Sequence, residues 1–157
     1  MKLQLWSIGK AHEAYVKDGI ADFTKRINKY FTADWLVLAP PKNAAVLSEA
    51  DLKKAEAEIV LQQLSKDDYL VLLDERGKQL SSPELAQLLQ QRANESHKKI
   101  VFLIGGAFGV SDAVMQRANY TLSLSKLVFP HMLVRLILAE QVYRACTILR
   151  NEKYHHL

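Results

Sequence analysis

The chain has a single cysteine, Cys146, among its 157 residues and therefore forms no internal disulfide. Disulfides belong to oxidising compartments, so this composition favours a reducing one. Cys146 lies in an apolar segment that we expect to be helical, where a cysteine is more often a small core residue than a nucleophile. The composition gives no reason to expect thiol chemistry.

Long apolar runs are also missing. A membrane-spanning helix needs about 18 or more consecutive apolar residues, and the richest segment, residues 132–149, is interrupted by Arg135, Glu140, Gln141 and Arg144. Residues 1–8 alternate polar and apolar side chains, unlike the continuous apolar core of a secretory signal. We therefore expect a cytoplasmic protein with no membrane partner.

Charge and length set wider bounds. Lys and Arg together number 21 against 17 Asp and Glu, which gives a net charge of +4. This mild excess fits a nucleic-acid partner but raises its probability only modestly. The length is typical of one domain, and 49% hydrophobic with 24% charged residues is ordinary for a globular protein. We expect residues 1–157 to form a single domain.

Strand-like and helix-like segments alternate along the chain. Alternating or continuous apolar patterns predict strands at residues 2–8, 35–39, 69–73, 100–104 and 120–124. Helical spacing and N-cap signals predict helices at residues 13–30, 48–64, 81–92 and 111–118, and the apolar segment at 132–150 predicts another. Strands separated by helices indicate an α/β fold with right-handed crossovers and a mostly parallel sheet.

Three segments follow the carboxyl ends of predicted strands, where such sheets bind ligands. They are residues 73–75, 105–109 and 125–130. The glycine loop Gly105-Gly106-x-x-Gly109 differs from the dinucleotide fingerprint G-x-G-x-x-G, and no acidic residue follows at the required spacing. Its two remaining interpretations are a ligand-binding loop and a turn that needs glycine only for backbone geometry.

The apolar helix carries an arginine in its hydrophobic stripe. At 100° per residue Arg135 shares a side with Leu138 and Val142, whereas Glu140 and Arg144 form an i,i+4 pair on the opposite side. Burial of an arginine is unfavourable unless it is paired or reaches a cleft. We therefore expect either a structural salt bridge or a guanidinium that faces a phosphate or carboxylate. The same ambiguity applies to His131.

The C-terminal tail, residues 151–157, shows no helix or strand pattern and would ordinarily be a frayed end. It also contains Tyr154 and His155, side chains of the kind that stack on nucleic-acid bases. Both interpretations stay open.

Taken in order, these residues closely resemble one known family over the whole chain. The resemblance is carried by Leu73-Asp74, the glycine loop, Ser123 to Lys126, Phe129-Pro130-His131, Arg135, Glu140 to Ala145, and Tyr154-His155. The sequence looks like the ribosomal RNA large subunit methyltransferase H family, small members of the SPOUT class. The family implies an α/β fold with a C-terminal trefoil knot, an exception to the rule that chains avoid knots.

The resemblance further implies a homodimer that uses S-adenosylmethionine, and no metal, to methylate N3 of a pseudouridine in helix 69 of 23S rRNA on the assembled ribosome. By matching position, the cofactor contacts would be Leu73, Gly105, Leu124, Ser125, Lys126, Leu127, Val128 and Phe129. Adenine would lie among Leu73, Leu124, Leu127 and Phe129, with its edge bonded to backbone groups. Phe108 would lie nearer the methionine end, where relatives more often have a polar residue.

Because S-adenosylmethionine supplies its own electrophile, the protein must chiefly align the base and assist the loss of its N3 proton. No obvious general base stands out. We expect Tyr154 and His155, supplied by the same or the partner subunit, to close over the base, and Arg135 or His131 to orient RNA. The competing interpretations are a non-catalytic RNA-binding module with the same fold and a nucleotide-dependent oxidoreductase.

Overall fold

The computed structural model describes residues 1–156 and has the alternating order that the sequence predicts. The strands are β1 (Lys2–Ile8), β2 (Thr32–Leu38), β3 (Tyr69–Gln79), β4 (Lys99–Ile104) and β5 (Tyr120–Ser123). The helices are α1 (Ala14–Ile27), α2 (Glu49–Gln63), α3 (Ser82–Asn94), α4 (Asp112–Arg117) and α5 (His131–Leu149), with a short 3₁₀ turn η1 (Ala44–Val46). Every predicted element is confirmed, with ends shifted by a few residues except for β3, which extends six residues beyond its predicted end.

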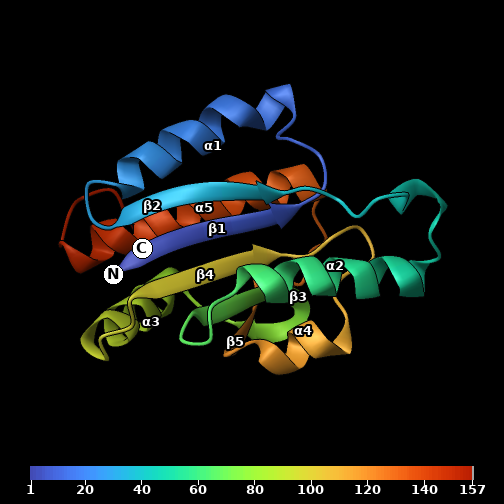
Figure 1. The fold of residues 1–157 in the computed structure, drawn as a ribbon. Helices are drawn as coiled ribbons and strands as arrows, with labels where there is room; N and C mark the ends of the chain where they lie inside the picture. The colour runs from blue at the N-terminus through green and yellow to red at the C-terminus, as the bar shows by residue number, and fades with distance from the viewer. Residues whose placement is uncertain (157) are drawn as a thin grey trace.

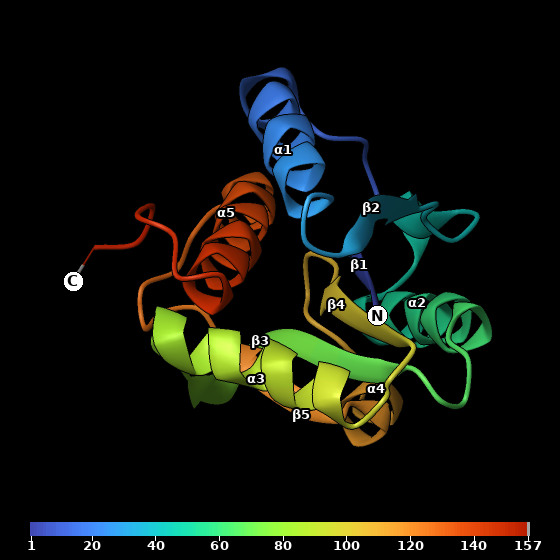
Figure 2. The ribbon, with the colours of Figure 1, turned by 90° about the vertical axis from the view of Figure 1, so that its left-hand side faces the viewer.

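The five strands form one sheet in the order β2-β1-β4-β3-β5, and all pairs are parallel. Helices α1, α3 and α5 cover one face and α2 and α4 cover the other (Figures 1 and 2). Alternate residues of β4 enter opposite cores: Phe102 packs beneath α3 and α5, and Leu103 beneath α2. This two-sided burial explains why β4 is a continuous apolar run.

The end of β3 differs from the prediction. The apolar run stops at Leu73, but the strand continues to Gln79. Leu73 and Lys78 both pair with Leu122 of β5, so the residues between them bulge from the ladder. A Cβ at Gly77 would lie 2.6 Å from the carbonyl oxygen of Thr121, so only glycine allows this close approach. Beyond Leu73 the strand leaves β4 and pairs only with β5, which is why polar residues are tolerated there.

Helix starts follow the predicted cap chemistry. The Ser48 hydroxyl accepts a hydrogen bond from the Asp51 amide at 3.2 Å, and Ser81 and Glu84 form a reciprocal capping box at the start of α3. Within residues 1–156, no helix combines the length and hydropathy that a membrane span requires.

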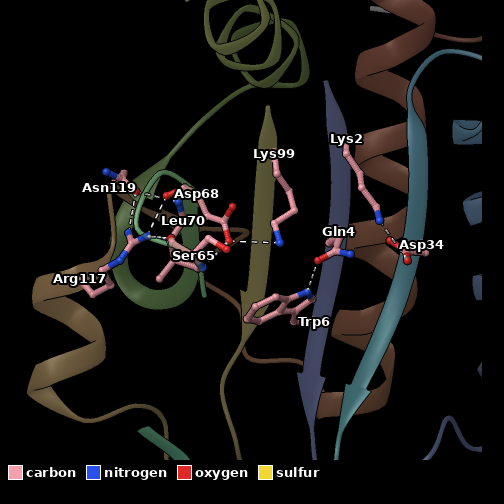
Figure 3. A network of polar contacts seen from close by, with 10 residues as sticks. All are labelled: Lys2, Gln4, Trp6, Asp34, Ser65, Asp68, Leu70, Lys99, Arg117 and Asn119. Carbon is pink, nitrogen blue, oxygen red and sulfur yellow. Dashed lines mark hydrogen bonds and ion pairs between the residues drawn. The ribbon is translucent and has the colours of Figure 1, made fainter. Parts of the chain in front are cut away.

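Polar contacts hold the sheet together at the amino ends of β3 and β4 (Figure 3). Lys99 Nζ lies 3.2 Å from Asp68 Oδ2, where both side chains are largely buried. Arg117, at the end of α4, donates to the carbonyl oxygens of Ser65 and Asp68 and to the side-chain oxygen of Asn119. The connection before β3 is therefore fastened to the one that leads into β5, at the end of the sheet opposite the loops described next.

Candidate functional site

A cavity of about 910 Å³ lies at the carboxyl ends of β3, β4 and β5. Its walls are residues 73–76, 104–110 and 122–129, together with Lys53, His131 and Val134. This volume is within the usual range for small-molecule sites. The prediction that three strand-end segments converge is confirmed, since all three line this one cavity.

All eight residues expected to contact a cofactor line this cavity: Leu73, Gly105, Leu124, Ser125, Lys126, Leu127, Val128 and Phe129. The segment that follows β5 is a turn held by its own serine, because the Leu127 amide donates to Ser125 Oγ at 3.0 Å. The turn leaves the Leu127 side chain 72% exposed beside the cavity. Exposed apolar surface next to a cavity is a surface that a ligand can cover.

The glycine loop adopts a tight turn. The Gly109 amide donates to the Gly106 carbonyl oxygen at 3.1 Å, and Gly109 has φ +84°, a left-handed conformation that favours glycine. The loop therefore needs glycine for its backbone geometry, and it also lines the cavity where a ligand could bind. The two interpretations of the glycine loop are compatible.

His131 fixes the glycine loop to the start of α5. Its Nε2 atom lies 2.9 Å from the Gly105 carbonyl oxygen, and because a carbonyl only accepts, Nε2 must carry the proton. Burial, with a smaller effect from Arg135, lowers the pKa of His131, which the bond to Gly105 partly opposes. A neutral imidazole can make this bond, so His131 acts on the loop rather than as an exposed cation.

Two charged residues in the cavity wall, Arg76 and Lys53, are not predicted from the sequence. Arg76 holds Asp74 through Nε–Oδ1 and Nη2–Oδ2 contacts of 2.9 and 3.1 Å, and this pairing lowers the pKa of the Asp74 carboxyl. Lys53 reaches the cavity from α2. The Asp-x-Arg spacing directly after an apolar strand could have indicated the first residue, but no local pattern indicates Lys53.

Arg135 is 1% exposed and does not line the cavity. Its Nη1 donates to the Lys10 carbonyl oxygen at 2.9 Å and lies 3.1 Å from His12 Nδ1. Among residues 1–156 it forms no ion pair with a carboxylate, so the expectation of a structural salt bridge was wrong. Instead, Arg135 joins α5 to the loop that follows β1.

Within residues 151–156 of the C-terminal tail, Tyr154 and His155 are packed against α5 rather than frayed, and Leu157 lies outside the described residues. The Tyr154 hydroxyl donates to Glu140 Oε2 at 2.9 Å, and Arg144 contacts the same oxygen at 3.1 Å, which confirms the expected Glu140–Arg144 pair. Arg144 Nη1 also lies 3.2 Å from His155 Nδ1, and the Tyr154 ring packs edge-on against Tyr143 at 4.7 Å. The interpretation of the tail as a frayed end was therefore wrong.

Neither Tyr154 nor His155 lines the cavity of its own chain. Glu140, which anchors Tyr154, is nine residues from His131, or about 13 Å along the axis of α5. In Figure 1 the tail lies at the end of the molecule where the strands begin. The structure thus brings together the eight residues expected to contact the cofactor and His131, but not Arg135, Tyr154 or His155.

The described residues contain no cluster of three or more His, Cys, Asp or Glu side chains placed to hold a metal ion.

Comparisons with known proteins agree with this architecture. Residues 1–155 match the family model described as "Predicted SPOUT methyltransferase". The chain is 47% identical to ribosomal RNA large subunit methyltransferase H of Cytophaga hutchinsonii, over 99% of this chain and all of the relative. It is 44% identical to the protein of the same name from Bacillus pumilus, over 99% of each chain.

Solved structures share the fold. A probable methyltransferase from Bordetella pertussis Tohama I superposes with a TM-score of 0.53 at 13% identity, covering 92% of this chain and 95% of that one. A probable methylase family protein from Haemophilus influenzae Rd KW20 gives 0.52 at 13% identity, covering 95% and 66%. Full-length identity above 40% to named relatives, together with the family match, settles membership. This chain belongs to the ribosomal RNA large subunit methyltransferase H family of SPOUT methyltransferases.

Proposed function

We propose that this protein transfers a methyl group from S-adenosylmethionine to N3 of pseudouridine 1915, in helix 69 of 23S rRNA on the assembled ribosome in the cytoplasm. One observation carries the proposal. All eight positions that the family resemblance assigns to the cofactor line a single cavity at the carboxyl edge of the sheet.

The cavity residues fit this cofactor. Apolar side chains from two strand ends, Leu73 and Leu124 with Leu127 and Phe129, form a wall suited to adenine, whose edge can bond to backbone groups. The glycine loop and Lys53 form the other side and suit the charged methionine end. S-adenosylmethionine supplies an electrophilic methyl group on a positively charged sulfur, so no metal or redox group is required.

The proposal includes a trefoil knot formed by the segments around β3 and β5. The close approach of Gly77 to the Thr121 backbone, together with the register shift of β3 against β5, supports a tight crossing at this point. In such a knot, residues 124–129, which follow β5, would be held in place by the chain segments that cross beside them.

The proposal also includes a homodimer in which the tail of one subunit serves the cavity of the other. Tyr154 and His155 contact Glu140 and Arg144 of α5 and do not line the cavity of their own chain. They can therefore meet a base there only by leaving these contacts, whereas the tail of a partner subunit could approach the cavity with its contacts intact. Packing against Glu140 and Arg144 keeps both rings in a fixed orientation. Their proposed role is to align the base for loss of its N3 proton.

For Arg135 we propose an indirect role in orienting RNA. Its guanidinium is buried and holds the backbone of Lys10, whose own side chain is on an exposed loop. The Lys10 ammonium is therefore available to a phosphate, while Arg135 sets the position of the loop.

Transfer of labelled methyl groups tests the function. Purified protein is incubated with labelled S-adenosylmethionine and, in parallel, with 70S ribosomes, separated subunits and free 23S rRNA. We expect incorporation into ribosomes that carry the pseudouridine, and none into matched ribosomes that carry uridine there. Binding to ribosomes without transfer would favour the non-catalytic module. Calorimetric binding of NAD in place of S-adenosylmethionine would favour an oxidoreductase.

A further inference from the structure

Glu56 on α2 is a buried carboxylate with no hydrogen-bond or ion-pair partner among the described residues. The residue is 9% exposed, and burial raises the pKa of its carboxyl. Lys53, one helical turn earlier, pairs with Glu49 at 3.8 Å instead. The carboxylate oxygens are not fully enclosed, so its raised pKa reflects partial burial, and a positive group brought by a ligand would stabilise the charged form.

The carboxylate lies directly against the glycine loop. A Cβ built at Gly106 would lie 2.5 Å from Glu56 Oε2 and 2.6 Å from Oε1. Gly106 also lines the cavity. Glu56 itself is not among the residues that line the cavity, so its carboxylate would act on a ligand seated on the loop across Gly106, which has no side chain to hold the two further apart.

The other shielded carboxylate near the cavity is already neutralised. The Asp74 side chain is 9% exposed, but Arg76 binds both of its oxygens. The neighbouring Glu75 is exposed to solvent. Glu56 is therefore the buried negative charge beside this cavity that has no cation of its own within residues 1–156.

We infer that Glu56 is a specificity-determining residue whose carboxylate stabilises the α-ammonium group of the cofactor's methionine end, seated against Gly106. The inference rests on the proposed function, which places adenine against the apolar wall and leaves the glycine loop to the charged end. A carboxylate a few ångströms from an ammonium in a partly enclosed site attracts it more strongly than an exposed carboxylate would. A ligand without the ammonium gains nothing from Glu56.

Calorimetry with three ligands tests this assignment. S-adenosylmethionine carries both the ammonium and the charged sulfur, S-adenosylhomocysteine carries only the ammonium, and 5′-methylthioadenosine carries neither. The variant is Glu56→Gln, which keeps the shape and removes the charge, and the matched control is Glu58→Gln, an exposed carboxylate on the same helix. A melting curve of each variant confirms that it is folded.

We expect Glu56→Gln to weaken the binding of both ligands that carry the ammonium by about fivefold, the scale of an attraction between two opposite charges that are near each other but not in contact. 5′-Methylthioadenosine should change less than twofold, and Glu58→Gln should change none of the three. Glu56→Asp, which retains the charge on a shorter side chain, should lie between wild type and Glu56→Gln, and it replaces that variant if the latter does not fold.

Three results would overturn the assignment. An equal loss of affinity for all three ligands would mean that Glu56 only shapes the loop. Unchanged affinity for all three would mean that Glu56 does not contribute to binding. Weakening of S-adenosylmethionine alone would place the effect at the charged sulfur. In each case the wild type still binds S-adenosylmethionine, so the proposed function stands. A wild type that binds none of these ligands would overturn the proposed function itself and the inference with it.

Discussion

His131 Nε2 donates to the Gly105 carbonyl oxygen at 2.9 Å and thereby connects the first turn of α5 to the floor of the cavity. Four residues later on the same helix, Arg135 holds the Lys10 carbonyl oxygen at 2.9 Å. The start of α5 thus fastens two loops at the carboxyl edge of the sheet. Through these two hydrogen bonds the helix sets the position of both loops.

The pH dependence of stability follows from His131. Burial places its folded pKa below the ordinary value of 6.5, so the unfolded chain binds a proton more readily than the folded one. The free energy of unfolding should therefore decrease as pH falls below about 6.5. Urea unfolding at pH 7.5 and 5.5 measures this loss, and His131→Gln, which keeps a donor but cannot titrate, should reduce it. An identical loss in the variant would assign the effect to other groups.

Arg135→Ala should destabilise the fold but leave cofactor affinity nearly unchanged. The substitution removes a buried donor from the Lys10 carbonyl oxygen and leaves a void, which should lower the free energy of unfolding by about 2–4 kcal/mol. Because Arg135 does not line the cavity, affinity for S-adenosylmethionine should stay within about twofold at a temperature where the variant is folded. A variant of normal stability that binds ribosomes poorly would instead indicate direct contact with RNA.

Deleting residues 154–157 should separate cofactor binding from turnover. The tail does not line the cavity of its own chain, so calorimetry should show nearly unchanged cofactor affinity. Methyl transfer to ribosomes should fall by about a hundredfold or more, the scale expected when groups that align a reacting base are lost. Tyr154→Phe, which loses only the hydroxyl bond to Glu140, serves as the conservative comparison. Full turnover by the truncated protein would remove the tail from the mechanism.

Gly106→Ala should displace the glycine loop. Its new Cβ would lie 2.5 Å from Glu56 Oε2, so the loop or α2 must shift. We expect the melting temperature to fall by several degrees, equivalent to about 1–3 kcal/mol, and Glu56→Ala in the same chain to restore part of it. Strictly additive effects of the two substitutions would show that these residues do not contact each other.

The sequence predicts the elements whose patterns are local. Strand β4 is continuous and apolar because both of its faces are buried, and the helices that begin after Ser48 and Ser81 carry their own cap signals. The convergence of three loops followed from the parallel topology, because carboxyl ends of parallel strands share one edge.

The remaining features depend on contacts between distant residues. The polar end of β3 pairs with β5 only because Gly77 permits a close backbone approach. The tail is held by Glu140 and by Tyr30, which donates to Glu152 across 122 residues of sequence. The burial of Arg135 could be predicted from its stripe, but its acceptor, a backbone carbonyl in another loop, could not.

The identity of the methylated atom distinguishes the proposed function from its alternatives. Ribosomes from cells that lack this protein are treated with the purified protein and S-adenosylmethionine, and the nucleosides around position 1915 of 23S rRNA are separated and identified by mass spectrometry. The proposed function predicts N3-methylpseudouridine at that position and no other new methylated nucleoside. A methyl group on a ribose, on another base or on no nucleoside would contradict it.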